Sequence, residues 1–254
     1  MSKSARKVWS MILTAVMVLS LLPVLSAAAW ADEPVTYPLW VNGEQFTAEK
    51  TIINCGEGTA VYDATNSRLT LTDATITIGG DRAIGIAVDG NAALDIILVG
   101  NNSISLDGNG IQTNDANITM SGAGKLTINT SAETRDGIST TGEFILIGDK
   151  AAKAIPELKI LASSGVGIAS DKTVKIENAK LTSEGLYAGI DAVNLIITDS
   201  TVKLKSSHEN CNAAYIREDQ TEDCGNITLM NSRVTAESYY PGLFAAGNIL
   251  IDGG

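Results

Sequence analysis

The sequence is poor in histidine, and this scarcity limits the chemistry available to it. Its 254 residues include one histidine, His208, which lies in a polar stretch. Serine and cysteine hydrolases need a neighbouring base, most often histidine, to activate the nucleophile. The composition therefore disfavours that mechanism, and it equally disfavours a metal site built on imidazole ligands.

Aromatic residues are also scarce, at 5% of the chain. Gly, Thr, Asn, Asp and Ile are plentiful, and this balance favours many short strands and turns over helices. Beyond residue 31, no segment is long and apolar enough to cross a bilayer. The composition thus predicts an all-β domain.

The first 31 residues have the pattern of a secretory signal peptide. Lys3, Arg6 and Lys7 precede an apolar run from residue 11 to residue 25, and small residues follow it. A basic start, an apolar middle and a small-residue cleavage region are typical of such signals. We expect cleavage before Asp32 and a secreted or cell-surface protein, and an uncleaved membrane anchor is the alternative.

Positive charge is sparse in the remaining chain, which has 15 basic residues against 29 acidic ones and a net charge of −14. Binding to nucleic acid or to an anionic membrane draws on positive charge. We therefore expect no nucleic-acid partner, and no membrane partner after signal cleavage. A surplus of carboxylates outside the cell suits a divalent cation such as Ca²⁺, although solubility alone would also explain it.

Three cysteines are present, and an exported protein can oxidise them. Cys211 and Cys224 bracket one polar loop, and we predict that they form a disulfide. Cys55 is left over, and we expect it to be buried as a small apolar residue.

A short pattern recurs along the chain at 25, 27, 30 and 22 residues. It begins with a Gly-Ile pair, continues through a polar turn, and ends in an alternating apolar segment. Periods of this length are typical of repeat architectures. Full copies occur at Gly85-Ile86, Gly110-Ile111, Gly137-Ile138, Gly167-Ile168 and Gly189-Ile190, with a degenerate copy near Tyr215-Ile216 and a last one at Gly242-Leu243.

Apolar residues alternate within each unit, as in Leu94, Ile96 and Leu98. A period of two indicates strands with one buried face, and most units hold two or three of them. A β-sandwich requires no fixed period, whereas a coil with one turn per repeat stacks equivalent residues into continuous columns. We predict a single-stranded, right-handed parallel β-helix of about seven rungs, with an insertion around residues 149–156 that bulges from one corner.

The two ends of the chain differ from the middle. Residues 32–72 contain an Asn42-Gly43 turn and a second hairpin pattern before Leu71, and we predict that they cap the first rung. Residues 73–254 form the predicted β-helix. Its last residues stop within a strand pattern, so we expect that the sequence is truncated there or that this edge pairs with another element.

This order of parts resembles a family of secreted carbohydrate-binding β-helix proteins of Gram-positive bacteria, whose fold is similar to that of pectate lyases. The resemblance implies a non-catalytic, calcium-binding domain that attaches to plant cell-wall polysaccharide, with acidic pectin and cellulose as substrates. It rests on Tyr37-Pro38-Leu39-Trp40-Val41-Asn42-Gly43, on residues 61–66 and 69–71, and on the Gly-Ile rungs with Ile118-Thr119-Met120 and Gly124-Lys125-Leu126-Thr127-Ile128.

Aspartate and asparagine recur at fixed distances from the Gly-Ile pairs. Asp89, Asn114 and Asp171 each lie three residues after the isoleucine, and Asp115 follows Asn114. Calcium takes six to eight oxygen ligands, which turn loops can supply, so these columns are candidate Ca²⁺ ligands. Their other explanation is that Asp and Asn simply favour turns. A second candidate column precedes the pair and comprises Asp81, Asp107, Asn109 and Asp136.

Candidate sugar-binding residues gather toward the C-terminus. Aromatic rings provide platforms for the faces of pyranose sugars. Tyr239 and Tyr240 are adjacent and cannot both point inward on a strand, so at least one should be exposed. We take Tyr187, Tyr239, Tyr240 and Arg135 as the candidate carbohydrate residues. Tyr215 and Phe244 belong to the same cluster, although Phe244 could equally fill the core.

Two enzymatic alternatives compete with binding. A polyuronate lyase needs a cation to neutralise the uronate and a base to remove a proton. Among Arg82, Lys125 and Arg135, only Arg135 adjoins a carboxylate, that of Asp136, and a solvated ion pair is the simpler explanation. An inverting glycosidase needs two carboxylates roughly 5 to 9.5 Å apart, which stacked aspartates could provide by accident.

These observations predict a secreted, monomeric, non-catalytic domain that binds polysaccharide, with Ca²⁺ bridging protein carboxylates to uronates. A polyuronate lyase is the first alternative. A structural surface spacer or adhesin is the second.

Overall fold

The computed structural model describes residues 34–80, 83–90, 93–131, 134–218 and 225–253. The chain divides into two units, Met1–Val35 and Thr36–Gly254. The second unit is described below, because the first lies almost wholly outside the described residues, as does the signal peptide predicted for residues 1–31. In the part of the chain that is described, none of the elements is a helix with the length and hydropathy of a membrane span.

Every regular element in the described ranges is a β-strand, and the strands form three sheets. Sheet A runs in the order β2 (Glu44–Thr47), β1 (Thr36–Val41), β7 (Ala83–Val88), β10 (Gly108–Thr113), β13 (Ile138–Thr140), β16 (Val166–Ser170), β19 (Ala188–Ala192), β22 (Ala214–Ile216) and β25 (Leu243–Ala245). Sheet B runs β26 (Ile249–Asp252), β23 (Ile227–Met230), β20 (Asn194–Thr198), β17 (Thr173–Glu177), β14 (Phe144–Ile147), β11 (Ile118–Gly122), β8 (Leu94–Val99), β5 (Arg68–Thr72), β4 (Gly58–Asp63) and β3 (Ile52–Cys55). Sheet C runs β24 (Arg233–Glu237), β21 (Thr201–Ser206), β18 (Lys180–Gly185), β15 (Glu157–Ala162), β12 (Lys125–Thr130), β9 (Asn101–Leu106) and β6 (Thr75–Ile76).

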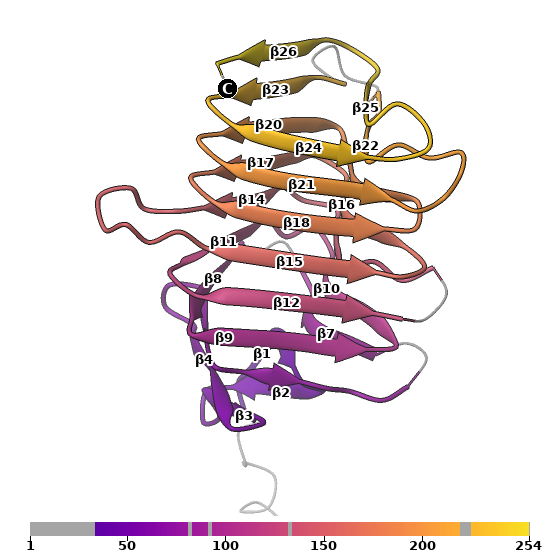
Figure 1. The fold of residues 1–254 in the computed structure, drawn as a ribbon. Coiled ribbons are helices and arrows are strands. Elements are labelled where there is room, and N and C mark those ends of the chain that lie inside the picture. The colour runs from indigo at the N-terminus through magenta and orange to yellow at the C-terminus, as the bar shows by residue number, and fades with distance from the viewer. Residues whose placement is uncertain (1–33, 81–82, 91–92, 132–133, 219–224, 254) are drawn as a thin grey trace, which may run out of the picture. The chain divides into compact units, whose positions relative to one another are not determined.

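Successive strands visit the three sheets in turn, so that β7, β8 and β9 make one rung and β10, β11 and β12 make the next (Figure 1). Each strand pairs in parallel with its counterpart in the neighbouring rung. The chain is therefore a parallel β-helix of about seven turns, and the fold class predicted from the repeat is confirmed.

The isoleucines of the repeat lie in register above one another. Ile111 pairs with Ile86 on one side and Ile138 on the other, and the column continues through Ile168 to Ile190. All five side chains are fully buried. Stacked identical side chains make one continuous apolar column, which is the stabilising unit of a solenoid.

The sixth rung departs from the predicted alignment. Ile190 pairs with Ala214, and Ala214 pairs with Leu243. The degenerate copy of the repeat is therefore Ala213-Ala214, two residues before the Tyr215-Ile216 pair near which it was predicted. Two alanines in place of Gly-Ile erased the sequence signal, while Gly242-Leu243 holds the position predicted for it.

Glycine precedes each isoleucine because neighbouring strands of the solenoid approach closely there. A Cβ atom built on Gly137 would lie 2.2 Å from Cγ2 of Ile160 and 2.6 Å from the carbonyl oxygen of Gly167. Both distances are shorter than atoms can tolerate, so a side chain at this position would push sheet C and the next rung away. The glycine therefore allows neighbouring strands to pack closely.

Antiparallel strands lie at the N-terminal end of the solenoid. β1 pairs with β2 across a turn in which Asn42 and Gly43 have φ angles of 53° and 78°, as predicted for this dipeptide. A second set, β3, β4 and β5, is also antiparallel. The fully buried Phe46 side chain lies beneath them, against Tyr62.

The 30-residue step of the repeat is explained by a hairpin between β14 and β15, which projects at the left of Figure 1. Asp149 and Ala154 form an antiparallel bridge at its base. Lys150 lies 2.5 Å from the carboxylate of Asp199. The insertion predicted at residues 149–156 is thus confirmed as a protruding corner loop.

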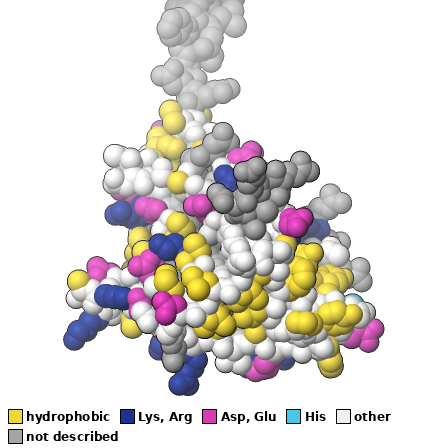
Figure 2. All heavy atoms as spheres, turned by 90° about the horizontal axis from the view of Figure 1, so that it is seen from above, with side chains coloured by type: hydrophobic (Ala, Val, Ile, Leu, Met, Phe, Trp, Pro, Cys, Tyr) yellow, Lys and Arg dark blue, Asp and Glu magenta, His cyan; other side chains and the backbone are white. Residues whose placement is uncertain are grey.

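At the other end of the solenoid, β24, β25 and β26 are the outermost strands of the three sheets. Figure 2 views this end, and hydrophobic side chains gather in the middle of it. Ile249, Leu250 and Ile251 of β26 are exposed.

Candidate binding face on the outer surface of sheet A

The outer surface of sheet A, which we call the A-face, carries two columns of side chains. Strands expose alternate residues, so the residue after each buried isoleucine points outward. The first column comprises Ile84, Asn109, Asp136, Val166 and Ala188. The second comprises Ala87, Gln112, Ser139, Ala169, Asp191, Tyr215 and Phe244.

Side chains of the first column hold the rungs together. Oδ1 of Asn109 accepts a 3.0 Å hydrogen bond from the backbone N–H of Asp136, one rung above. Oδ1 of Asp136 in turn accepts a 2.9 Å bond from the N–H of Val166. Asn109 also donates through Nδ2 to Oε1 of Gln112 at 2.8 Å. This side-chain ladder satisfies backbone donors at the corner where each strand of sheet A begins.

Burial raises the pKa of the Asp136 carboxyl above its ordinary value, because the charged form is poorly hydrated there. The hydrogen bond from Val166 and the positive charge of Arg135 oppose that rise. Asp136 is therefore a partly buried carboxylate held in a fixed position on the A-face.

Arg217 links two further carboxylates. Its Nε atom donates a hydrogen bond to Oδ1 of Asp191 at 2.9 Å. Its Nη2 atom donates to Oδ1 of Asp171 and to the carbonyl oxygen of Ser170, both at 2.8 Å. Burial is again the largest influence on Asp191 and raises its pKa, while Arg217 lowers it and the charges of Asp136 and Asp171 raise it. The charges of Asp136 and Asp171 thus both influence the pKa of Asp191.

An aromatic pair lies above Asp191 in the second column. The rings of Tyr215 and Phe244 stack with centroids 5.2 Å apart and planes 14° apart. Tyr215 is 41% exposed and Phe244 is 40% exposed. Phe244 therefore belongs to the outer surface, and the alternative that it fills the core was wrong.

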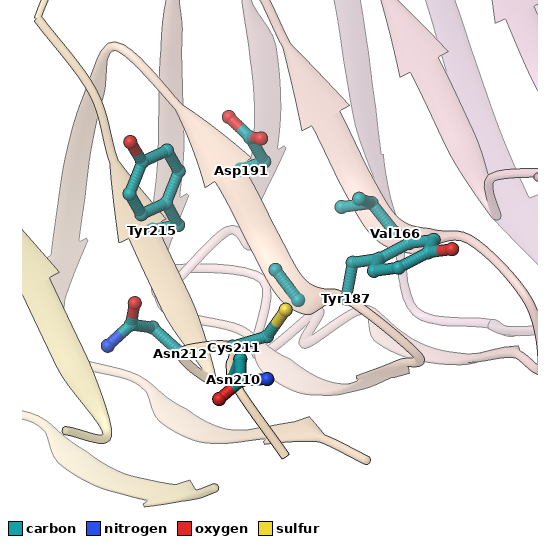
Figure 3. Close-up of a pocket in the computed structure, with 8 residues that line it drawn as sticks. Val166, Tyr187, Asp191, Asn210, Cys211, Asn212 and Tyr215 are labelled. Carbon is teal, nitrogen blue, oxygen red and sulfur yellow. The ribbon is translucent and has the colours of Figure 1, made fainter. Parts of the chain in front are cut away.

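A hollow of about 260 Å³ opens beside this pair. In the view of Figure 3, the Asp191 carboxyl and the Cys211 thiol lie between the rings of Tyr215 and Tyr187. Asn210 and Asn212 complete one wall. Two aromatic rings, a carboxyl and two amides thus converge on one cavity, which is the usual composition of a small-ligand site.

A second hollow of about 390 Å³ lies on the lower rungs of the same face. It is lined by Ala83, Ile84, Asn109, Gln112 and Arg135. The A-face thus carries two concave regions, on rungs one to three and on rungs four to six, with Asp136 and Ser139 on the third rung.

The predicted calcium residues are brought together only in part. Asp89 and Asn114 do stack, and Nδ2 of Asn114 donates to Oδ1 of Asp89 at 3.3 Å. Thr141 holds the equivalent position in the next rung, where its hydroxyl accepts a hydrogen bond from the backbone N–H of Asp115 and donates one to the carboxylate of Asp115. Asp171 lies beyond Thr141 and is bound to Arg217.

In the second predicted column, Asn109 and Asp136 are neighbours in the hydrogen-bonded ladder. Asp107 lies outside that ladder, and its carboxylate accepts a hydrogen bond from the hydroxyl of Ser131. Asp81 lies outside the described residues. Within the described ranges, no group of three or more His, Cys, Asp or Glu side chains is arranged to hold a metal ion.

Of the predicted sugar residues, Tyr187 lines the upper hollow and Arg135 lines the lower one. Tyr239 and Tyr240 follow β24, with exposed fractions of 78% and 53%, so both are exposed where at least one was predicted to be. Tyr239 lines a separate hollow with His208.

The cysteine predictions have different outcomes. Cys55 is fully buried, as predicted, and burial raises the pKa of its thiol, with a smaller contribution from the charge of Glu44. Sγ of Cys211 lies 3.5 Å from Nδ1 of His208. Cys224 lies outside the described residues, so its disulfide with Cys211 stays a prediction.

Four polar residues of the A-face were not among the sequence-based candidates: Gln112, Ser139, Asp191 and Arg217. The first three share one signal, because each directly follows the isoleucine of a Gly-Ile pair and must point outward if the isoleucine points inward. Arg217 has no such signal. It reaches Asp171 across 46 positions of the sequence, and only the coiling of the chain brings them together.

Comparison with known proteins gives no neighbour: no family model, no curated protein and no solved structure matches the chain. The class that the fold defines is the parallel β-helix, with a polar and aromatic face on sheet A.

Proposed function

We propose that the chain is a secreted, non-catalytic polysaccharide-binding protein whose binding surface is the A-face. The observation that carries this proposal is the exposed Tyr215–Phe244 stack beside a hollow that contains Asp191 and two asparagines. Aromatic faces pack against the C–H faces of sugar rings, while carboxylates accept hydrogen bonds from sugar hydroxyls and side-chain amides both accept and donate them.

The periodicity of the face supports a polymer as the ligand. The two hollows are about two to three rungs apart, and neighbouring rungs in a sheet are spaced about 4.8 Å apart. A chain of sugar units that runs across the strands would meet Arg135 and Asn109 in one hollow and Tyr187 and Tyr215 in the other. Extended repetitive surfaces of this kind are a common use of solenoid folds.

We further propose that Ca²⁺ assists this binding. The A-face carries Asp136 and Asp191, with Asp171 at its margin, against the two cations Arg135 and Arg217. Acidic sugars would meet repulsion from the carboxylates unless a cation came between them. A Ca²⁺ ion takes oxygen ligands from both sides and would supply that bridge.

The test is affinity electrophoresis of the purified chain through gels that contain pectate, xylan or a soluble cellulose derivative, each with calcium or with a chelator. Retarded mobility in at least one polysaccharide is expected, and in pectate the retardation should be stronger with calcium than with the chelator. Unchanged mobility in all gels would support a passive spacer instead. Ultraviolet-absorbing unsaturated product, formed from pectate and calcium, would establish a lyase and contradict the non-catalytic assignment.

A further inference from the structure

The basic residues of this acidic chain are concentrated on the outer surface of sheet C, which we call the C-face. Figure 1 shows its strands β9, β12, β15, β18, β21 and β24 lying side by side toward the viewer. The face carries three carboxylates, those of Glu157, Glu184 and Glu237. Six cations lie among them: Lys125, Lys159, Lys180, Lys203, Lys205 and Arg233.

This distribution opposes the charge of the whole chain. After residue 31 the chain has 15 basic and 29 acidic residues. Six of those 15 lie on one face, where cations outnumber carboxylates two to one. The C-face therefore has a net positive charge, whereas the chain as a whole is negatively charged.

Its central column has a regular composition. The strand register stacks Ser103, Thr127, Lys159, Thr182, Lys203 and Thr235 directly above one another. Hydroxyl groups thus alternate with ammonium groups over the upper rungs, and no carboxylate interrupts the column. Since neighbouring rungs are about 4.8 Å apart, successive lysines of the column are roughly 10 Å apart.

Three cations of the face form ion pairs with its carboxylates. Lys125 lies 2.9 Å from Glu157, Lys205 lies 3.7 Å from Glu184, and Lys203 lies 3.3 Å from Glu237. All six groups are partly exposed, and pairs of this kind exchange readily with other ions because each is worth at most about 1 kcal/mol. Within the described ranges, the other three cations, Lys159, Lys180 and Arg233, have no carboxylate within 4.0 Å.

We propose that the C-face binds an acidic polysaccharide directly, without a bridging cation. A sugar acid offers a carboxylate and several hydroxyls on each unit, and the central column offers ammonium and hydroxyl groups in alternation. The flexible lysines bind the carboxylates as point charges, and the threonines exchange hydrogen bonds with the hydroxyls. This surface is separate from the A-face and does not depend on the function proposed there.

Nucleic acid is a poorer fit to the same face. It carries about one charge per 1.7 Å of duplex, and its binding requires many phosphate contacts. The C-face has only three cations in excess, and the surrounding protein is acidic. A hydroxyl-rich polymer with one carboxylate per sugar unit carries fewer charges per unit length than a duplex and suits such a surface better.

The test compares two triple variants with the parent chain. Lys159→Gln, Lys180→Gln and Lys203→Gln together remove charge from the C-face. Lys150→Gln, Lys153→Gln and Lys172→Gln remove the same charge elsewhere. The probe is sodium polygalacturonate in an affinity gel with a chelator present, with its methyl-esterified form and single-stranded DNA in parallel gels, and thermal melts check folding.

The parent chain should bind polygalacturonate in the chelator and lose binding as salt rises. The C-face triple should bind at least about tenfold more weakly, since each exposed contact adds a modest energy, and the control triple should bind like the parent. Equal binding by both triples, binding only with calcium, or equal retention by DNA would overturn the proposal. The chelator separates the two surfaces, because it removes the calcium proposed for the A-face and leaves the ammonium groups of the C-face in place.

Discussion

The aromatic rings of Tyr215 and Phe244 lie one above the other, with centroids 5.2 Å apart, on neighbouring strands β22 and β25. In the rungs below them, the same column holds small or polar residues such as Asp191, Ala169 and Ser139. The column therefore changes from small or polar side chains to two large aromatic ones at Tyr215. If the A-face binds polysaccharide as proposed, this stack fixes the position of a sugar ring along the solenoid.

We predict that Tyr215→Ala weakens polysaccharide binding at the A-face by about tenfold, equal to about 1.4 kcal/mol. The substitution removes one ring of the platform and one wall of the upper hollow. Mobility as a function of polysaccharide concentration in an affinity gel gives the dissociation constant. Leu250→Ala is the matched control, because Leu250 is an exposed large side chain on sheet B. Equal weakening by both variants would show that the effect is not specific to the A-face.

We predict that Gly137→Ala destabilises the protein by roughly 1 to 3 kcal/mol. The added methyl group would overlap Ile160 and the carbonyl oxygen of Gly167, so the rungs must move apart. Gly79→Ala is the control, since a Cβ there meets no atom within 4 Å. Denaturant unfolding measures both, and a neutral result at Gly137 would contradict the close approach described between rungs.

We predict that Asp136→Asn raises the free energy of unfolding at neutral pH. Burial raises the pKa of this carboxyl in the folded state, so the folded protein holds the proton more tightly than the unfolded chain does. Stability therefore falls as pH rises from the ordinary aspartate pKa through the raised one. Asparagine removes the charge and keeps an oxygen that accepts the hydrogen bond from Val166, as Asn109 does one rung below.

Denaturant unfolding between acidic and neutral pH checks this prediction. The parent chain and the variant should converge at low pH, where Asp136 is protonated, and separate as pH rises. A variant that is less stable at neutral pH would show that the charge of Asp136, next to Arg135, stabilises the fold.

Calcium binding is predicted to depend on Asp89 and Asp136. Asp89→Ala and Asp136→Ala should each weaken calcium uptake in a calorimetric titration, because each removes carboxylate oxygens from a proposed column. Glu49→Ala, at an exposed residue outside the A-face, is the control. If both aspartate variants take up calcium like the parent chain, the assignment of the columns is wrong.

The solenoid itself could be predicted because its signal is local and repeated. Alternating apolar residues define strands, and Gly-Ile pairs such as Gly110-Ile111 and Gly137-Ile138 fix the register of one rung on the next. Where the pair is replaced by Ala213-Ala214, the sequence no longer marks the register. The structure keeps it through the pairing of Ile190 with Ala214.

The candidate sites were less predictable, because they depend on contacts between outward side chains that do not repeat. Asp171 matches a calcium-binding pattern by spacing, yet Arg217 holds its carboxylate. Phe244 is apolar, yet its column faces outward. Both outcomes follow from the phase of the strands and the conformation of long side chains, which a spacing pattern does not contain.

The most direct test of the A-face as a polysaccharide-binding surface is a calorimetric titration of whichever polysaccharide retards the parent chain. The titration compares the parent chain with the double variant Tyr215→Ala, Phe244→Ala, both carrying Lys159→Gln, Lys180→Gln and Lys203→Gln so that the C-face does not contribute. The parent should release or take up heat on binding, and the double variant should bind at least about a hundredfold more weakly, equal to about 2.8 kcal/mol. Equal affinity of the two proteins, with both folded, would contradict the assignment of sheet A as the binding face.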